Sequence, residues 1–178
     1  MIYVFLENGF EEVEALAPID ILRRAGAELA TVGEGGRVVT SSHHVKVTAD
    51  LEENEISLDD MDMVILPGGP GTKNHEDSPM VRASLNYCAN HDKYIAAICA
   101  APSVLGHLGL LKGHSAVCFP GYEDELDAEK VLQDPVCVSG KIITARGAGV
   151  SIEFALKLVE VLFGAEKSQE IRKKIQCI

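Results

Sequence analysis

Short apolar runs alternate with longer amphipathic stretches along most of this chain. An unbroken short apolar run bounded by turn residues is typical of a strand buried on both faces, and apolar residues at helical spacing are typical of an amphipathic helix. The runs predict strands at residues 2–6, 28–32, 63–66, 94–98 and 115–119. The stretches predict helices at residues 11–25, 78–90, 151–163 and 165–175.

Turn and cap residues mark several of these ends. Gly26 ends the first predicted helix, and Pro18 inside it predicts a kink. Ser78 followed by Pro79 is a favourable helix start, with serine as the N-cap and proline in the first helical position. The remaining pattern predicts a hairpin from residues 136–138 and 142–144, and an edge strand or hairpin arm over residues 41–47.

The alternation of strands and helices predicts the fold class. Strands separated by helices favour a mostly parallel sheet with helices on both faces, which is an α/β fold. The sequence contains no linker, internal repeat or low-complexity tract, so residues 1–178 are assigned to one domain.

Chemistry is expected along one edge of that sheet, because open parallel sheets bind ligands beyond the carboxyl ends of their strands. Three predicted strand ends carry residues suited to this. They are Glu7-Asn8-Gly9, Pro67-Gly68-Gly69 and Cys99.

Cys99 lies where the strand 94–98 turns into a predicted helix that begins with residues 100–105. Small residues, Ala97 and Ala101, lie two positions away on each side, as a nucleophile elbow requires. A helix N-terminus beside a thiol stabilises the reactive thiolate. The alternative is a packing cysteine, since free cysteine is among the most buried residue types. The corner and the glycine-rich turn before it favour a reactive thiol.

Gly68 and Gly69 also have two interpretations. Pro-Gly-Gly commonly ends a strand in a plain turn. Glycines also let backbone N–H groups approach a ligand closely and form an oxyanion pocket. A nucleophile on the same edge favours the second interpretation.

Three glutamates cluster at the start of the first predicted helix. Acidic residues in a first turn are stabilised by the helix dipole, which is sufficient to explain Glu11 and Glu12. Glu14 shares the edge of an apolar stripe with Phe10 and Ile21. A carboxyl group held against apolar surface tends to stay protonated, and a protonated carboxyl can donate a hydrogen bond to a thiolate.

Composition and charge exclude several classes of function. The formal net charge is −11, which disfavours nucleic acids and anionic membranes as partners. No apolar run is long enough to span a bilayer, and the first residues lack the basic region of a signal peptide. Five cysteines without a C-x-x-C pair fit neither a disulfide framework nor a zinc site. A reducing cytoplasm is therefore expected.

The other cysteines and the histidines carry weaker signals. Cys88, Cys118, Cys137 and Cys177 are expected to be packing or surface residues. Solvated or capping roles are expected for most of the six histidines, none of which shows metal-ligand spacing. His75 is the one nearest in sequence to the proposed site.

The chain resembles the DJ-1/PfpI (ThiJ) superfamily over nearly its whole length, and the DJ-1 branch in particular. Four motifs, in their order and spacing, carry this resemblance. They are GFEEVE at residues 9–14, LPGG at 66–69, AAICAAP at 96–102 and TARGAG at 144–149. The resemblance implies a flavodoxin-like three-layer sandwich, a homodimer, and a reactive Cys99 hydrogen-bonded to a protonated Glu14. It implies an anion pocket from the backbone of Gly68, Gly69 and Ala100, with Glu11 among the substrate-binding residues, and neither metal nor cofactor.

The sequence departs from related branches at several positions. Ala100 stands where the protease-like branch has a histidine, and the His-x-Glu pair of the related amidotransferases does not follow Cys99. Phe119 precedes Pro120 where some DJ-1 branch members have a histidine. These departures disfavour a Cys-His hydrolase, meaning a protease or amidase.

Three hypotheses follow from the residues and the resemblance. The first is a cysteine-dependent enzyme that detoxifies reactive carbonyls, as a glutathione-independent glyoxalase or a deglycase acting on glycated protein. The second is a redox-sensing or chaperone-like stress protein in which Cys99 is oxidised rather than turned over. The third is an inert domain on the same fold, since a fold does not dictate a function.

Overall fold

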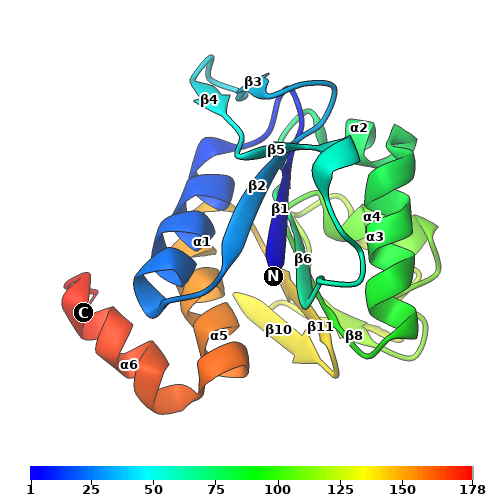
Figure 1. Ribbon diagram of the computed structural model, residues 1–178. Coiled ribbons are helices and arrows are strands. Elements are labelled where there is room, and N and C mark those ends of the chain that lie inside the picture. The colour runs from blue at the N-terminus through cyan, green and yellow to red at the C-terminus, as the bar shows by residue number, and fades with distance from the viewer. Residues whose placement is uncertain (178) are drawn as a thin grey trace.

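The apolar runs form a central sheet of seven strands in the computed structural model, which describes residues 1–177 (Figure 1). In chain order the strands are β1 (Ile2–Leu6), β2 (Leu29–Gly33), β5 (Leu51–Glu52), β6 (Met63–Leu66), β7 (Tyr94–Ile98), β10 (Val136–Ser139) and β11 (Ile142–Ala145). Their spatial order is β10-β11-β7-β6-β1-β2-β5, and all neighbours are parallel except the β10–β11 hairpin. The predicted mostly parallel sheet is confirmed.

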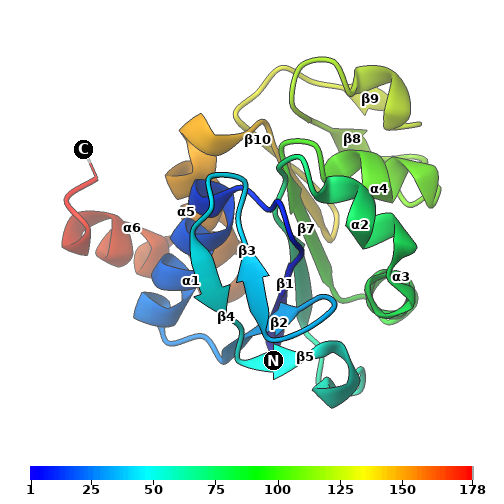
Figure 2. The same ribbon diagram turned by 90° about the horizontal axis from the view of Figure 1, so that it is seen from above.

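Helices cover both faces of this sheet, as Figure 2 shows from above. One face carries α1 (Glu12–Ala25), α5 (Ser151–Phe163) and α6 (Ala165–Lys174), and the other carries α2 (Thr72–Asp77), α3 (Pro79–Asn90) and α4 (Pro102–His107). Ile19 and Phe154 belong to the core on the first face, and Val81 and Leu105 to the core on the second. The chain therefore has the three-layer α/β arrangement that the sequence predicted.

The two cores explain why the three central strands β1, β6 and β7 are apolar at every position. Successive side chains of a strand point to opposite faces of a sheet. In β1, Val4 and Leu6 enter one core, and Tyr3 and Phe5 enter the other. A strand covered on both faces therefore needs an unbroken apolar run rather than alternation.

The hairpin that projects above the sheet differs from the prediction. Its arms are β3 (Val38–Thr40) and β4 (Lys46–Thr48), which pair antiparallel. Most of the expected strand over residues 41–47 is instead the turn between these arms, where His44 has a φ of 67°. The polar run Ser41 to His44 suits a turn better than a strand.

The predicted strand 115–119 is also shorter than expected. Only β8 (Ser115–Ala116) is a strand, and it pairs with β9 (Lys130–Val131) outside the main sheet. The reason is that later N–H groups bond elsewhere: Val117 donates to Thr144 Oγ1 at 2.9 Å, and Phe119 donates to the Cys99 carbonyl at 2.8 Å.

Other elements were missed or shifted by small amounts. The sequence did not predict α2, β5 or β9, and the helix expected from residue 100 begins at Pro102. Ser151 is the first helical residue of α5 rather than its cap. Short 3₁₀ turns occur at Glu53–Glu55, Glu123–Glu125 and Ala148–Val150.

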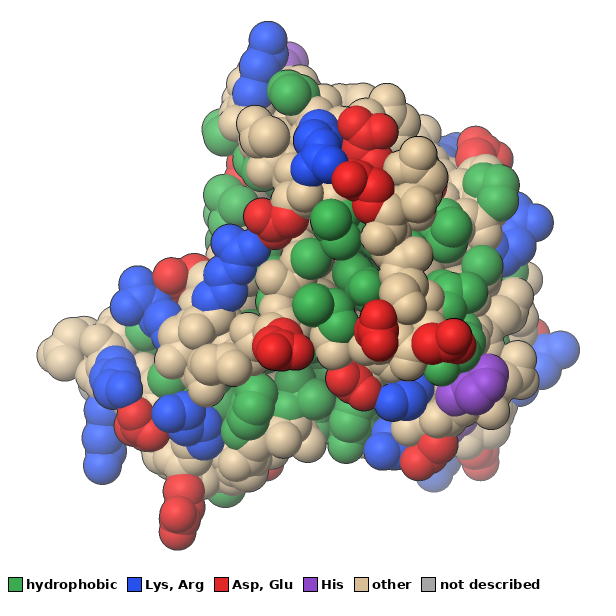
Figure 3. All heavy atoms as spheres, in the orientation of Figure 1, with side chains coloured by type: hydrophobic (Ala, Val, Ile, Leu, Met, Phe, Trp, Pro, Cys, Tyr) green, Lys and Arg blue, Asp and Glu red, His purple; other side chains and the backbone are tan. Residues whose placement is uncertain are grey.

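The surface of the described residues mixes charge signs. On the face seen in Figure 3, acidic and basic side chains are interspersed with apolar ones. Within residues 1–177, no helix has both the length and the apolar character needed to cross a membrane.

The parallel strands bring distant residues to one edge of the sheet. Glu7 follows β1, Glu34 follows β2, Pro67 follows β6, Cys99 follows β7 and Arg146 follows β11. Because these strands are parallel, all five residues leave the sheet on the same side. The edge that the sequence selected for chemistry therefore exists.

Phe154 and Phe163 in α5 allow a matched test of this packing. Phe154 is fully buried and Phe163 is 45% exposed. We expect Phe154→Ala to lower the free energy of unfolding by about 3–5 kcal/mol, and Phe163→Ala to change it by less than about 1 kcal/mol. Urea unfolding of both variants measures the difference, and equal losses would contradict the assigned core.

Candidate active site

Cys99 occupies a strained corner between β7 and α4. Its φ is 67°, in the left-handed region that residues other than glycine seldom adopt. The corner is held on both sides, because the Cys99 N–H donates to the Ala145 carbonyl at 2.9 Å and the Cys99 carbonyl accepts from Phe119. The side chain is partly exposed, so the strained conformation leaves the sulfur within reach of solvent.

Glu14 reaches this corner from the first turn of α1. It is only 1% exposed, and its Oε2 accepts a hydrogen bond from the Gly68 N–H at 3.0 Å. Glu11 is the N-cap of the helix and accepts from the Glu14 N–H at 2.9 Å. The helix start thus fixes the Glu14 backbone, and the Gly68 N–H fixes its carboxylate.

Gly68 is required for Glu14 and Cys99 to approach each other. A Cβ atom at Gly68 would lie 2.6 Å from the Cys99 Cβ and 2.7 Å from Glu14 Oε2, closer than van der Waals contact allows. A side chain at this position would therefore separate the acid from the thiol. The plain-turn interpretation of the two glycines does not explain this close approach.

The charges of Glu14 and Cys99 depend on one another. Burial raises the pKa of Glu14 to about 7, although hydrogen bonds from Cys99 and Gly68 act to lower this pKa. Burial and then the Glu14 carboxylate raise the pKa of Cys99 to about 12, while the backbone N–H groups of Ala100 and Gly69 act in the opposite direction. Two anions in this site are disfavoured, so near neutral pH Cys99 keeps its proton while Glu14 is partly protonated, and at most one of the two groups is charged.

This result corrects the expected state of the sulfur. The sequence predicted a stable thiolate beside a neutral Glu14. In the structure the thiolate requires the shared proton to be on Glu14, and an ionised Glu14 keeps the proton on the sulfur. The α4 helix near the thiol is also short, Pro102–His107. The sequence also predicted a protonated Glu14, and burial raises the pKa of Glu14 in that direction, to about 7.

The other two glutamates of the cluster have structural partners. Glu11 is the N-cap already described. Glu12 holds the hairpin turn: its carboxylate accepts from Ser41 Oγ at 2.6 Å and from the His43 N–H at 2.9 Å. Removal from water acts to raise the pKa of Glu12, but hydrogen bonds from His43 and Ser41 lower it overall. These contacts explain both residues without a ligand, and the substrate-binding role of Glu11 stays a prediction.

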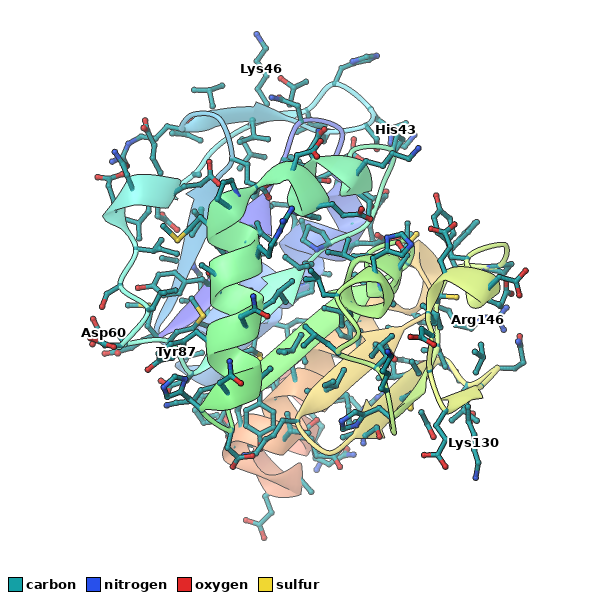
Figure 4. All side chains as sticks on the ribbon, turned by 90° about the vertical axis from the view of Figure 1, so that its right-hand side faces the viewer. His43, Lys46, Asp60, Tyr87, Lys130 and Arg146 are labelled. Atoms are coloured by element: carbon teal, nitrogen blue, oxygen red, sulfur yellow. The ribbon has the colours of Figure 1, made fainter. Side chains whose placement is uncertain are left out.

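A shallow surface depression of about 460 Å³ lies beside Phe119, whose N–H bonds to the Cys99 carbonyl, but neither Cys99 nor Glu14 is among the residues that line it. Its walls include Phe119, Arg146, Gly147 and Val150. A Cβ atom at Gly147 would lie 3.2 Å from the Phe119 ring and 3.7 Å from Glu14 Oε1, which places the depression beside the Glu14 carboxylate. Figure 4 shows that Arg146 lies well apart from His43, which belongs to the turn of the β3–β4 hairpin.

Three ionisable residues that the sequence analysis did not assign to the site lie buried beside it. His75 in α2 is 0% exposed and stands between Glu7 and Glu34, which are 1% and 8% exposed. His75, which the sequence set apart only as the histidine nearest the proposed site, is therefore a fully buried residue beside that site. The available signal was position: two of the three residues directly follow buried strands, and the third follows the glycine turn.

Two clusters of the described residues have donor atoms close enough to hold a metal ion. They are Glu7 with Glu34 and His75, and Glu11 with Glu12 and His43. In both clusters the histidine Nδ1 already lies at hydrogen-bond distance from a glutamate oxygen, 2.6 Å in the first and 2.9 Å in the second. Protons are sufficient to explain these distances.

The remaining cysteines lack the partners of Cys99. Cys88, Cys118 and Cys137 are buried, as expected for packing residues, and burial raises the pKa of Cys88 to about 12. Cys177 is partly buried near Arg172. Cys99 is therefore distinguished by its Glu14 partner and its strained backbone, rather than by a low pKa.

Comparisons with known proteins agree with this geometry. The chain is 38% identical over 174 residues to Protein dj-1beta of Drosophila melanogaster, which covers 96% of this chain and 93% of that protein. It is 30% identical over 167 residues to the protein of Caenorhabditis elegans named Glutathione-independent glyoxalase DJR-1.2, covering 93% and 89%.

Solved structures give the same result. The crystal structure of Drosophila melanogaster DJ-1beta matches with a TM-score of 0.94 and 36% identity, over 99% of this chain and 97% of that one. The structure titled Toxoplasma gondii DJ-1, oxidized, matches with a TM-score of 0.91 and 40% identity, over 98% and 97%. The family model for the DJ-1/PfpI family matches residues 1–161. This chain is therefore a member of the DJ-1/PfpI family.

Proposed function

We propose that this protein is a cofactor-free enzyme that uses Cys99 to convert reactive 2-oxoaldehydes, such as methylglyoxal, into 2-hydroxy acids. The observation that carries the proposal is the Cys99–Glu14 pair, in which a buried carboxyl group with a pKa near 7 shares one proton with a partly exposed thiol. A relative over most of the chain is named as a glutathione-independent glyoxalase, which supports this reaction class.

The first step forms a carbon–sulfur bond. The Cys99 Sγ attacks the aldehyde carbon while its proton passes to the Glu14 carboxylate, so that sulfur is never an anion beside another anion. The Gly69 and Ala100 N–H groups face the sulfur, as their effect on its pKa indicates, and would stabilise the developing oxyanion. Protonation of that oxygen gives a hemithioacetal.

The second step moves hydrogen between adjacent carbons. Glu14 removes the proton from the carbon bonded to sulfur and returns a proton to the neighbouring carbonyl carbon, through an enediol. This converts the hemithioacetal into a thioester of a 2-hydroxy acid. Water then cleaves the carbon–sulfur bond, releasing the acid and restoring the thiol, so the net reaction is addition of one water to the 2-oxoaldehyde.

Attack on the carbonyl carbon of a glycated side chain, followed by hydrolysis, would make the protein a deglycase.

A second candidate function is redox sensing, with or without chaperone-like activity. The observation in its favour is that the sulfur is partly exposed and has backbone N–H groups beside it, which can also bind the oxygens of an oxidised cysteine. Peroxide treatment followed by mass spectrometry tests it. Oxidation of Cys99 without turnover of carbonyl substrates favours this function, and oxidation of Cys177 in place of Cys99 contradicts it.

The homodimer and the cytoplasmic location also remain proposals. Exposed apolar side chains on α1 and on the hairpin are compatible with an interface between two copies: Val13 is 50% exposed and Val45 is 47% exposed. A Cys-His hydrolase is the least supported activity, because the residue after Cys99 is Ala100.

Replacing the nucleophile should eliminate turnover. We expect Cys99→Ser to reduce methylglyoxal conversion to background, because a hydroxyl with an ordinary pKa is a far weaker nucleophile than a thiolate. Cys177→Ser is the control and should keep wild-type activity. Production of lactate by purified protein measures both, and full activity in Cys99→Ser would rule out the proposed mechanism.

Glu14→Gln should separate proton transfer from thiol reactivity. The carboxamide can donate a hydrogen bond to sulfur but cannot carry a proton between carbons, so we expect kcat to fall by about 100-fold or more. Loss of the negative charge should shift alkylation of Cys99 by iodoacetamide to lower pH, because that charge raises the pKa of the thiol. Retention of wild-type kcat would show that another group moves the proton.

Glu14 should also make stability depend on pH. Its pKa of about 7 in the folded protein lies above the ordinary 4.5, so its contribution is fully present below pH 4.5 and is lost as pH rises through 7. The wild type should lose up to about 3 kcal/mol relative to Glu14→Gln over this range. Urea unfolding of both proteins at several pH values measures it. A difference that stays constant with pH would mean that Glu14 ionises normally.

A further inference from the structure

The cluster of Glu7, His75 and Glu34 is the most unusual feature that the proposed mechanism does not use. All three side chains are buried, and they come from three different parts of the chain. Burying charged groups costs several kcal/mol per ion unless partners compensate. The Glu7 carboxylate oxygens and Glu34 Oε2 have no hydrogen-bond partner among the described residues. A purely stabilising role is therefore a poor explanation of the cluster.

The distances define where the protons of His75 lie. Nδ1 is 2.6 Å from Glu34 Oε1, and Nε2 is 3.2 Å from the Pro67 carbonyl. A carbonyl oxygen can only accept, so Nε2 carries a hydrogen, and the contact between Nδ1 and Glu34 Oε1 requires one hydrogen between these two atoms. Nε2 is also 3.0 Å from Glu7 Oε2, but its N–H is directed at Pro67. The geometry therefore fits an imidazolium that donates from both nitrogens.

The charge balance agrees with this assignment. The charged groups that act on His75 are Glu7 and Glu34, and despite burial they raise its pKa well above 6.5. Burial raises the pKa of Glu7, which favours its neutral form. An imidazolium, one carboxylate and one protonated carboxyl group leave the buried cluster without net charge.

The hydrogen bond to Pro67 connects this cluster to the cysteine site. Pro67 directly precedes Gly68, whose N–H holds the Glu14 carboxylate. The next residue is Gly69, whose N–H faces the Cys99 sulfur. The turn is also tied to the start of α1 by a 2.9 Å bond from the Glu11 N–H to the Gly68 carbonyl. The Pro67 carbonyl and the Gly68 N–H belong to one peptide unit, so rotation of that peptide would turn the Gly68 N–H away from the Glu14 carboxylate.

We propose that His75 is a positioning residue, which Glu34 orients and which fixes the Pro67–Gly68 peptide so that the Gly68 N–H points at Glu14, the partner of Cys99. This role rests on the proposed function, because its effect on turnover can be measured only if the protein converts methylglyoxal. His75 touches neither the substrate nor the sulfur; it acts through the Pro67 carbonyl.

A divalent cation is the main alternative occupant of this cluster. A metal would need an unprotonated His75 nitrogen, and both nitrogens already face acceptors at hydrogen-bond distances. Insertion of an ion between Nε2 and its neighbours at 3.0–3.2 Å would require them to move apart. The proton assignment needs no such movement.

The decisive variant replaces the whole cluster by apolar side chains of similar size, Glu7→Met/Glu34→Met/His75→Leu. Replacing a buried ionic cluster in this way is often neutral or stabilising, so we expect a Tm equal to or above that of the wild type. Without the bond to Pro67, kcat for methylglyoxal should fall by about tenfold or more with little change in KM, since small displacements of reacting groups are costly. Alkylation of Cys99 should be slower by about threefold or more near neutral pH.

Two further measurements keep the test decisive. Alkylation does not require turnover, so absence of activity in the wild type would refute the proposed function while alkylation still tests His75. A triple variant that folds with wild-type alkylation and wild-type kcat would overturn the positioning role. If the variant does not fold, nitrogen-15 NMR of wild-type His75 decides, because the inference requires hydrogens on both ring nitrogens at neutral pH. A single ring hydrogen, or a Tm raised by zinc and lowered by EDTA, would overturn it.

Discussion

The coupled protonation of Glu14 and Cys99 is the interaction on which the proposed chemistry depends. Burial makes two neighbouring negative charges unfavourable, so at most one of the two groups is charged at neutral pH. The same burial makes the carboxyl group a proton acceptor and donor near pH 7. The arrangement exists because Gly68 has no side chain, since a Cβ atom would lie within 2.7 Å of both groups.

The parallel sheet is what brings the members of this site together. Glu14 comes from the helix after β1, Gly68 from the turn after β6 and Cys99 from the corner after β7, and these strands are adjacent in the sheet. All of them end at one edge, where backbone N–H groups are no longer used by the sheet and can face a ligand or a side chain. The backbone strain at Cys99 is held by bonds to Ala145 and Phe119 on either side of the corner.

A second group of buried charges adjoins the first. His75 and its two glutamates are all buried, and three of the glutamate oxygens lack hydrogen-bond partners within residues 1–177. Both clusters act on the same short turn, one through the Pro67 carbonyl and the other through the Gly68 N–H. Two consecutive residues of the turn are thus held from opposite sides, which restricts the motion of the peptide that carries the site.

The sequence by itself determined the order of the main strands and helices, the edge of the sheet where chemistry is proposed, and the choice of Cys99 and Glu14 as the candidate reactive pair. Local patterns are sufficient for these, because apolar runs, cap residues and glycine turns act over a few positions. Only the tertiary structure decided the charge state of the sulfur, the short extent of β8, and the burial of His75 between Glu7 and Glu34. Those features depend on contacts between residues far apart in the chain, where burial and neighbouring charge set the proton affinities that sequence position does not reveal.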